Sequence, residues 1–296
     1  MSSIPHYKIL LFGPTGKVGS ELLSRLQRDA HHVIACPRQA ADLTSPTAIH
    51  DAILKHSPDV VINAAAYNGM EACERDTQIA DAVNTVAPAL MASAARKVDA
   101  AFIHYSTDYV FSGDPFGLSE ESPIAPSGYY GWTKHQGEIA VSHSSDDYLI
   151  FRLSTIYGRA FAGPLDPVSQ VRQGRGTRDQ PIGILHQRCA PTSARLVADA
   201  TAYVLATTSR EDLRRRAGIY HLATREGVWR ADFVPAILDM VCGADPERQF
   251  ATITLPIPRP VHSVLLTGKF ERMFGYPLPD WRVDFGATLP VILGRG

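Results

Sequence analysis

The chain has 296 residues, of which 45% are hydrophobic and 20% are charged, and its formal net charge is −1. This length suits one or two domains with ample chain to bury a core, and the composition is ordinary for a globular protein. Because the net charge is close to zero, nothing favours nucleic acid or an acidic membrane as a partner.

Four cysteines are spread along the chain, at positions 36, 73, 189 and 242. They form no Cys-x-x-Cys pair, so the sequence predicts neither a zinc site nor a disulfide framework. The first residues lead almost directly into a strand, without the basic and long apolar regions of a signal peptide, and no apolar run approaches membrane-spanning length. We therefore expect a cytoplasmic protein without a membrane partner.

A glycine-rich turn, Gly13 to Gly19, follows the first expected strand, Lys8 to Phe12, and precedes a helix whose leucines recur on one face. In this context glycines let the backbone turn tightly and approach a pyrophosphate, whose charge meets the amino end of the helix. The spacing Gly-x-x-Gly-x-x-Gly is the variant used by the short-chain dehydrogenase/reductase group. The sequence thus predicts a dinucleotide site near the start of the chain.

The end of the second expected strand, His32 to Cys36, bears on the choice of cofactor. NAD-binding folds usually place an acidic residue there to bind the ribose 2'-hydroxyl, but this chain has Arg38 and no acid until Asp42. An arginine suits a 2'-phosphate, so the sequence favours NADP(H), with NAD(H) as the alternative. Arginines are mostly surface residues, and Arg38 as a merely exposed side chain is the competing interpretation.

Strands alternate with helices through the first half of the chain. This alternation predicts right-handed crossovers and an α/β fold with a Rossmann-type doubly wound parallel sheet. Ligands lie at the carboxyl ends of such strands, where Gly13, Ala64 and Thr107 all fall. The further expected elements are a helix from Pro46 to about His56 capped by Ser45, a strand Val60 to Ala64, a helix from about Ile79 to Arg96 bent at Pro88, a strand from Phe102, the helix of Tyr130, and a strand Leu149 to Leu153.

Tyr130 and Lys134 are four residues apart on an expected helix, so the lysine ammonium can lie close to the tyrosine phenol. A neighbouring cation favours the phenolate, which makes the phenol a usable proton donor and acceptor near neutrality. Thr107, at the carboxyl end of the preceding strand, can add a hydroxyl beside the same oxygen. This tyrosine and lysine spacing is common in helices, and the nucleotide turn is what favours a catalytic role over a structural one.

Beyond Tyr157 the pattern changes to that of a smaller α/β region. We expect residues 1–157 to form an NADP-binding Rossmann domain and residues 158–296 to form mainly a substrate-binding region, with some segments returning to the Rossmann core. Residues 158–183 are rich in Gly, Pro, Arg and Asp and are predicted to carry loops. The remaining expectations are a helix capped by Ala190-Pro191-Thr192-Ser193, a short strand Ile219 to Leu222, a helix from about Arg230 to Val241, and a solvated helix end or turn at Arg214 to Arg216.

The string Ser106-Thr107-Asp108-Tyr109-Val110-Phe111, taken with Tyr130 and Lys134, is far more specific than any glycine motif. With it, nearly the whole chain resembles the dTDP-4-dehydrorhamnose reductase family of extended short-chain dehydrogenase/reductases. The other matching stretches are Gly13 to Gly19, residues 58–67, His104-Tyr105, Ala190-Pro191-Thr192, Tyr220-His221, Arg259-Pro260 and Ser263.

The resemblance implies that NADPH delivers hydride to the C4 ketone of dTDP-4-dehydrorhamnose while Tyr130 donates the proton. Lys134 would bind the nicotinamide ribose and hold down the pKa of Tyr130, and Thr107 would help to polarise the ketone. The implied substrate contacts are Thr107, Asp108, Tyr109 and Thr155. The implied cofactor contacts are Gly13, Thr15, Gly16, Lys17, Val18, Arg38, Asp42, Leu43, Ala64, Ala65, Ala66, Tyr67, Tyr105, Tyr130 and Lys134.

Thr155 is the main departure from the family, because it stands where a tryptophan usually packs near the substrate. A reductase of a different 4-keto-deoxy sugar nucleotide is therefore one alternative. Another is a non-catalytic NADP-binding subunit like the regulatory subunit of methionine adenosyltransferase, which resembles the same group. The glutamates that bind magnesium between subunits in some members find no match near the carboxyl end, so we expect no metal. Besides a dTDP-sugar, the partner left open is a second copy in a homodimer.

Overall fold

A computed structural model describes residues 6–158 and 166–293 of the chain. Six parallel strands form the central sheet, in the order β10-β5-β4-β3-β1-β2. The doubly wound parallel sheet expected from the sequence is therefore confirmed. The strands are β1 Lys8–Phe12, β2 His32–Cys36, β3 Val60–Asn63, β4 Ala101–Thr107, β5 Tyr148–Leu153 and β10 Gly218–His221.

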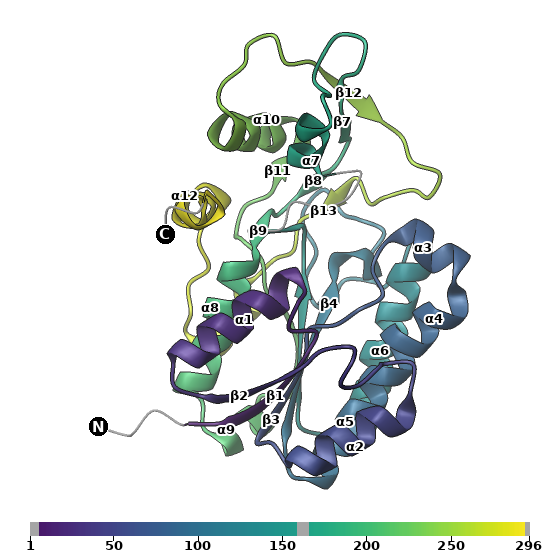
Figure 1. Cartoon of the computed structure of the whole chain (residues 1–296), viewed down its shortest axis with the longest axis vertical. Helices are drawn as coiled ribbons and strands as arrows, with labels where there is room; N and C mark the ends of the chain where they lie inside the picture. The colour runs from purple at the N-terminus through teal and green to yellow at the C-terminus, as the bar shows by residue number, and fades with distance from the viewer. Residues whose placement is uncertain (1–5, 159–165, 294–296) are drawn as a thin grey trace.

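Helices cover both faces of this sheet (Figure 1). Successive side chains of a strand point to opposite faces, so Ile9 and Leu11 of β1 pack in one core cluster and Leu10 and Phe12 in the other. The first cluster includes residues of α1 Lys17–Arg28 and α8 Ala194–Thr207, and the second includes residues of α2 Pro46–His56 and α5 Ala87–Lys97. Burial on both faces explains why these strands read as continuous apolar runs.

The long helix expected between Ile79 and Arg96 is divided in the structure. It consists of α4 Thr77–Asp81, the π-helical segment η1 Ala82–Val86, and α5, which carries Pro88 in its first turn. A proline lacks the N–H that would bond to the carbonyl four residues earlier, here that of Asn84. The helix α6 Tyr129–Ser144 packs closely there, because a Cβ on Gly137 would lie 2.2 Å from the Asn84 oxygen. A short helix before this unit, α3 Met70–Arg75, was not predicted.

The second half of the chain builds a smaller region beyond the carboxyl ends of the large sheet (Figure 1). Its core packs Tyr157, Phe233, Trp281 and Phe285. The segment predicted to carry loops contains α7, and its residues 159–165 lie outside the described residues. The elements of this half are β6 Ile156–Tyr157, α7 Pro167–Arg172, β7 Ile182–Leu185, β8 Arg188–Cys189, β9 Thr192–Ser193, α9 Arg210–Arg215, β11 Val228–Trp229, α10 Arg230–Cys242, β12 Phe250–Ile253, β13 His262–Ser263, α11 Gly268–Phe274 and α12 Trp281–Ile292.

Ser45 and Ser193 cap their helices as the sequence predicts, with each side chain accepting a bond from the backbone N–H three residues on. The chain returns to the large sheet at β10, which pairs with β5. Within residues 6–158 and 166–293, no helix combines the length and the apolar character needed to cross a bilayer.

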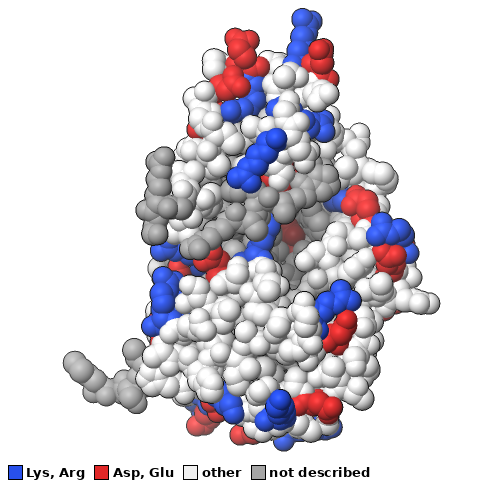
Figure 2. Space-filling view, viewed as in Figure 1, with Lys and Arg blue, Asp and Glu red and all other residues white. Residues whose placement is uncertain are grey.

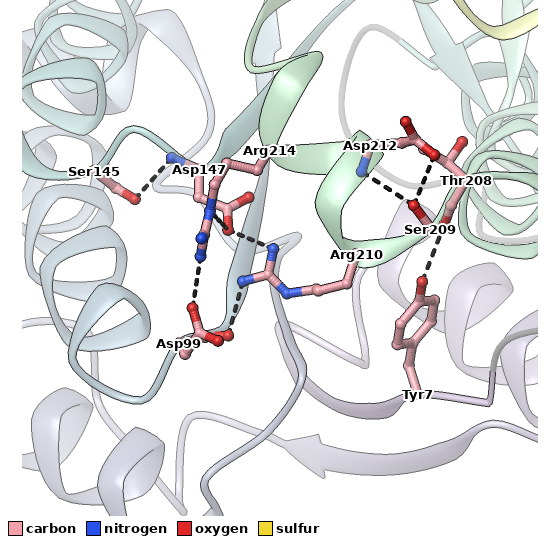
Figure 3. A network of polar contacts seen from close by, with 9 residues as sticks. All are labelled: Tyr7, Asp99, Ser145, Asp147, Thr208, Ser209, Arg210, Asp212 and Arg214. Carbon is pink, nitrogen blue, oxygen red and sulfur yellow. Dashed lines mark hydrogen bonds and ion pairs between the residues drawn. The ribbon is translucent and has the colours of Figure 1, made fainter.

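Paired charges fix α9 to the amino-terminal edge of the sheet, which here means the side where its parallel strands begin (Figure 3). Asp147, which precedes β5, forms ion pairs with Arg210 and Arg214 of α9. Asp99, which precedes β4, accepts from Arg210 through its carbonyl and from Arg214 through its carboxylate. The prediction of a helix end at Arg214 to Arg216 is confirmed, but Arg214 is a structural ion-pair partner as well as a half-exposed side chain.

Candidate active site

The glycine turn is held against the end of β3 by close backbone contacts. Gly13 has a φ of +74°, and a Cβ at this position would lie 2.7 Å from the backbone nitrogen of Ala65. A Cβ on Gly19 would lie 1.9 Å from the carbonyl oxygen of Gly13, so only glycine lets α1 approach the turn. The first turn of α1, which starts at Lys17, carries no acidic residue, and its backbone N–H groups can face an anion.

Two adjoining cavities lie at the carboxyl ends of the strands, in the part of the molecule where the surface in Figure 2 is hollowed. The first, of about 260 Å³, is lined by the predicted cofactor residues Gly13, Thr15, Gly16, Arg38, Asp42, Leu43, Ala64, Ala65, Ala66 and Tyr67. The second, of about 430 Å³, is lined by Lys17, Val18, Tyr105, Thr107, Tyr130 and Lys134 among others. Gly16, residues 64–66 and Asn68 line both, so the two cavities form one cleft.

Arg38 and Asp42 mark the far end of the first cavity. The Arg38 side chain is 79% exposed, and its Nε donates to an Asp42 oxygen over 2.9 Å. Asp42 also accepts from the backbone N–H and the hydroxyl of Thr44. These Thr44 bonds, with the Arg38 cation, lower the pKa of the Asp42 carboxyl. The guanidinium is thus held beside the cavity by a local ion pair, with most of its surface free for another anion.

The Tyr130 phenol enters the second cavity from the first turn of α6. It donates a long bond of 3.5 Å to the amide oxygen of Asn68, and its ring meets that of Tyr109 edge to face. Burial raises the pKa of Tyr130, with the Asp108 charge adding to this, while the Thr107 hydroxyl opposes it. This upward shift of the Tyr130 pKa is opposite to the lowered pKa expected from the neighbouring lysine. A raised pKa keeps the phenol protonated, which is the form that a proton donor needs.

Lys134 lies one turn further along α6, and its side chain is buried apart from its place in the lining of the second cavity. Its Nζ lies 3.0 Å from His104 Nε2 and donates to the carbonyl of Tyr105 over 2.7 Å. Burial lowers the pKa of Lys134 to about 8, although the Glu138 charge on the same helix opposes this. In this structure the ammonium is therefore directed to β4, and the sequence had not indicated His104 as its neighbour.

Asp108 begins the 3-10 turn Asp108–Val110 after β4 and is almost fully buried. Its two carboxylate oxygens accept from the hydroxyls of Thr107 and Ser154, each over 3.2 Å. Burial raises the pKa of Asp108 to about 6, against these hydroxyls and that of Ser263. The carboxyl group can thus change its charge near neutrality, next to the predicted catalytic residues.

Two further predicted substrate contacts lie on the side of the smaller region. Burial raises the pKa of Tyr109, while Arg230 and Gln187 act to lower it. Thr155 contacts the buried thiol of Cys189, and its carbonyl accepts from Thr192. Where the chain passes from β5 to β6, Leu153, Ser154 and Ile156 line the cleft and Thr155 does not. The structure therefore does not bring the Thr155 side chain to the Tyr130 phenol.

A buried ion pair links α6 to β5 of the central sheet. Glu138 accepts two bonds from Arg152 of β5, over 2.9 and 2.6 Å, and both side chains are about 98% buried. Removing either partner would leave an uncompensated charge in the interior. The pair fixes the helix that carries Tyr130 and Lys134 to the strand at its side.

Asn68, His104 and Ser154 are site residues that the sequence did not single out. Asn68 directly follows the predicted Ala64 to Tyr67 stretch, and His104 lies in β4, the strand that ends at Thr107. Their closeness in sequence to predicted site residues was therefore the available signal. Ser154 stands beside the noted Thr155. Among the residues the structure describes, no three His, Cys, Asp or Glu side chains gather as a metal site would require.

Comparison with known proteins gives a consistent result. The RmlD substrate binding domain family matches residues 7–292. A dTDP-4-dehydrorhamnose reductase of Burkholderia thailandensis is 35% identical over 301 residues, covering 97% of this chain and 100% of the relative. The reductase of the same name from Escherichia coli is 33% identical, covering 93% and 94% of the two chains.

Solved structures agree with the sequence relatives. The crystal structure of a dTDP-4-dehydrorhamnose reductase from Clostridium acetobutylicum has a TM-score of 0.84 and 25% identity, covering 96% of this chain and 99% of that one. A Bacillus anthracis structure in complex with NADP has the same TM-score at 22% identity, over 96% and 99% of the chains, and shares the fold. The resemblance expected from the sequence is confirmed, and the chain belongs to the RmlD substrate binding domain family.

Proposed function

We propose that this protein reduces the C4 ketone of dTDP-4-dehydrorhamnose with NADPH, giving dTDP-L-rhamnose. The observation that carries the proposal is the convergence of Thr107, Tyr130 and Lys134 in a cavity that adjoins the glycine turn. The names of the relatives support the same substrate, since two of them, each covering over nine-tenths of this chain, are dTDP-4-dehydrorhamnose reductases.

The cleft fits a dinucleotide on two grounds. Gly13 and Gly19 let the turn pack directly against Ala65 and α1, where a Cβ would meet backbone atoms, and the acid-free start of α1 offers N–H groups to a pyrophosphate. When bound there, the reduced nicotinamide supplies a hydride to the carbonyl carbon. Arg38 would contact a 2'-phosphate, while Asp42 lies on the same rim for an adenosine hydroxyl or amine.

The chain's own residues would handle the proton and the developing charge. As the ketone oxygen gains negative charge, the Tyr130 phenol donates its proton to that oxygen, and the resulting phenolate is stabilised by hydroxyl and ammonium groups nearby. Thr107 lies beside Tyr130, and its hydroxyl, which here donates to Asp108, can donate to the same oxygen once it turns toward the substrate. Lys134 is placed to contact a ribose on the cavity floor and to supply positive charge when protonated.

Replacing Tyr130 by Phe tests the proposal, and the neighbouring Tyr129 provides a matched control. Tyr130→Phe should lower kcat at least about 100-fold, because general acid catalysis contributes about that much or more. Tyr129 points to another face of α6, where its hydroxyl donates to Asp81, so Tyr129→Phe should keep near-normal turnover. Turnover is followed by the loss of NADPH absorbance with dTDP-4-dehydrorhamnose made in situ. Near-normal activity of Tyr130→Phe would contradict the assignment.

A second candidate is a reductase of a different 4-keto-deoxy sugar nucleotide. A relative from Streptomyces antibioticus favours it, which is 31% identical over 96% of this chain and is named as a probable dTDP-4,6-dihydroxy-2-methyloxan-3-one 4-ketoreductase. Comparing kcat/KM for several keto-sugar nucleotides decides between the two, because specificity is a difference in transition-state binding. Cofactor binding without turnover of any of them would instead favour the regulatory-subunit alternative.

Three further properties stay predictions. Preference for NADPH is measured as the ratio of kcat/KM for NADPH and NADH, and Arg38→Ala should lower it. A homodimer is checked by light scattering of the purified protein, and a cytoplasmic location by fractionation of the producing cells.

A further inference from the structure

His104 lies in the middle of β4 and has no exposed surface. Its ring stacks on Phe102, and its two nitrogens face two different side chains. Nε2 is 3.0 Å from Lys134 Nζ, and Nδ1 is 3.2 Å from the amide nitrogen of Asn63, the residue paired with it on β3. Both neighbours of the ring are nitrogens that ordinarily donate.

The orientation of the Asn63 amide is fixed on its other side. Its Oδ1 accepts from the backbone N–H of Ala65 over 3.1 Å. If the amide were turned over, its NH2 would face that N–H, and two donors would oppose each other in a buried place. The Asn63 NH2 group is therefore directed to His104 and donates to Nδ1.

A neutral imidazole carries one proton, so a ring that accepts at Nδ1 must carry it on Nε2. The Nε2–H then points at Lys134 Nζ. A charged ammonium has no lone pair to receive it, whereas a neutral amine has one. At the same time, the amine can still donate one of its two hydrogens to the carbonyl of Tyr105.

From this geometry we propose that Asn63 and His104 are positioning residues that donate along a chain, from Asn63 to His104 to Lys134, and stabilise the neutral amine of Lys134 in the cofactor-free protein. The charge of Lys134 then depends on what enters the cleft rather than being permanent. This inference deepens the proposed function, on which its catalytic consequence rests. The hydrogen-bond chain itself does not depend on the substrate.

The charged groups around Lys134 do not contradict this chain. Glu138, one turn further along α6, favours the ammonium, but both of its oxygens are already engaged by Arg152 of β5. On the other side, Tyr130 lines the cavity and stays neutral because burial raises its pKa, and the Asp108 carboxyl is engaged by the hydroxyls of Thr107 and Ser154. Burial lowers the pKa of His104 well below its ordinary value, which keeps the ring neutral.

One competing arrangement exists for the ring proton. The backbone carbonyl of Asn63 acts to raise the pKa of His104 and could accept a proton from Nδ1. In that case Nε2 would accept from a charged Lys134, and the Asn63 side chain would play no part. The two arrangements differ in a quantity that can be measured, namely which ring nitrogen carries the proton.

The test is nitrogen NMR of the wild-type protein with labelled histidine, recorded without cofactor at about pH 9, above the pKa of about 8 of Lys134, where its amine is mostly neutral. The expected result is a proton on Nε2 of His104, identified by the loss of its signals in His104→Phe. His31 provides an internal reference, because its Nδ1 accepts from the backbone N–H of Tyr7 and its proton must be on Nε2. A proton on Nδ1 of His104 would overturn the proposal, whatever the activity of the enzyme.

Asn63→Asp sharpens the test, since a carboxylate can accept from both Ala65 N–H and the ring. The His104 proton should move to Nδ1, and the titration midpoint of Lys134, read from its labelled Cε, should rise by at least about one pH unit. The alkaline limb of the kcat/KM profile should move with it. If the added charge acted alone, the Lys134 midpoint would rise while the His104 proton stayed on Nε2, and that result would contradict the proposal. Unchanged midpoints with a lower thermal stability would show a merely structural role and would contradict the proposal.

Discussion

The two edges of the central sheet hold polar groups in opposite ways. At the amino-terminal edge, Asp147 is paired with two arginines of α9, and the Tyr7 hydroxyl donates to the carbonyl of Thr208 over 3.0 Å (Figure 3). At the carboxyl-terminal edge, Asp108 and Lys134 are more deeply buried and have no opposite charge as a direct partner among the described residues.

The difference teaches where stability and activity come from in this fold. Paired charges at one edge compensate each other and hold α9 to the strands. Desolvated groups without an ion-pair partner cost folding free energy, and this same cost brings their pKa values near neutrality, where proton transfer is useful. Substitutions at the amino-terminal edge should therefore change stability, and those at the carboxyl-terminal edge should change pH dependence and activity.

The largest effect on stability is expected from Asp147→Ala at the amino-terminal edge. Its side chain is only 8% exposed, and its removal leaves the part-buried Arg210 guanidinium without a carboxylate. The loss should be about 2 kcal/mol, below the value for a fully buried pair because Arg210 reaches solvent. Denaturant unfolding measures it, while kcat/KM per folded molecule should not change. A loss of activity with wild-type stability would break the comparison.

Asp108→Asn should act in the opposite direction at the other edge. The folded pKa of Asp108, about 6, is above the unfolded value of 3.8. Between these pH values the folded chain binds more protons than the unfolded chain, so this group makes stability fall as pH rises from about 4 to 6. An asparagine has no such fall, and one of the two hydroxyls of Thr107 and Ser154 can turn to accept from its NH2 group while the other still donates to its amide oxygen.

The variant should consequently be more stable than wild type by about 2 kcal/mol at pH 8, with the gain disappearing near pH 4. Its KM should rise about tenfold if the carboxylate contacts the sugar nucleotide, as the family resemblance implies. Unfolding curves at the two pH values check the first part. If wild type and Asp108→Asn had the same pH dependence, the carboxyl would not be the buried titrating group.

The sequence predicted most of the Rossmann half because its signals are local. The apolar run Lys8 to Phe12, the cap at Ser45 and the glycine turn each depend on neighbours within a few residues, and each is found where expected. In the smaller region, the helix expected from about Arg230 to Val241 is found as α10, but the short strands were not predicted. These strands, such as β8 Arg188–Cys189 and β13 His262–Ser263, are two residues long and pair across more than seventy positions, which no periodicity reveals.

The site shows the same division between local and distant information. The spacing of Tyr130 and Lys134 placed both in one cavity with Thr107, but it also suggested that the lysine acts on the phenol directly. The structure turns the amine toward His104, because β4 lies behind that face of α6. Side-chain direction within a buried cluster depends on pairing between strands, as with Asn63 and His104, and such pairing follows from the fold rather than from spacing.

The smallest effect is expected from Asp99→Asn, which tests whether burial rather than charge count decides the comparison. Asp99 also pairs with Arg214, but its side chain is 81% exposed, and such pairs contribute little. The residue has a φ of +56°, which asparagine adopts about as readily as aspartate. The thermal midpoint should therefore stay within about 2 °C of wild type. Asp99→Ala removes the same charge but strains the backbone, so its midpoint should fall further than that of Asp99→Asn. Equal losses in Asp99→Asn and Asp147→Ala would mean that charge number, not desolvation, holds this edge, and the contrast between the two edges would lose its physical basis.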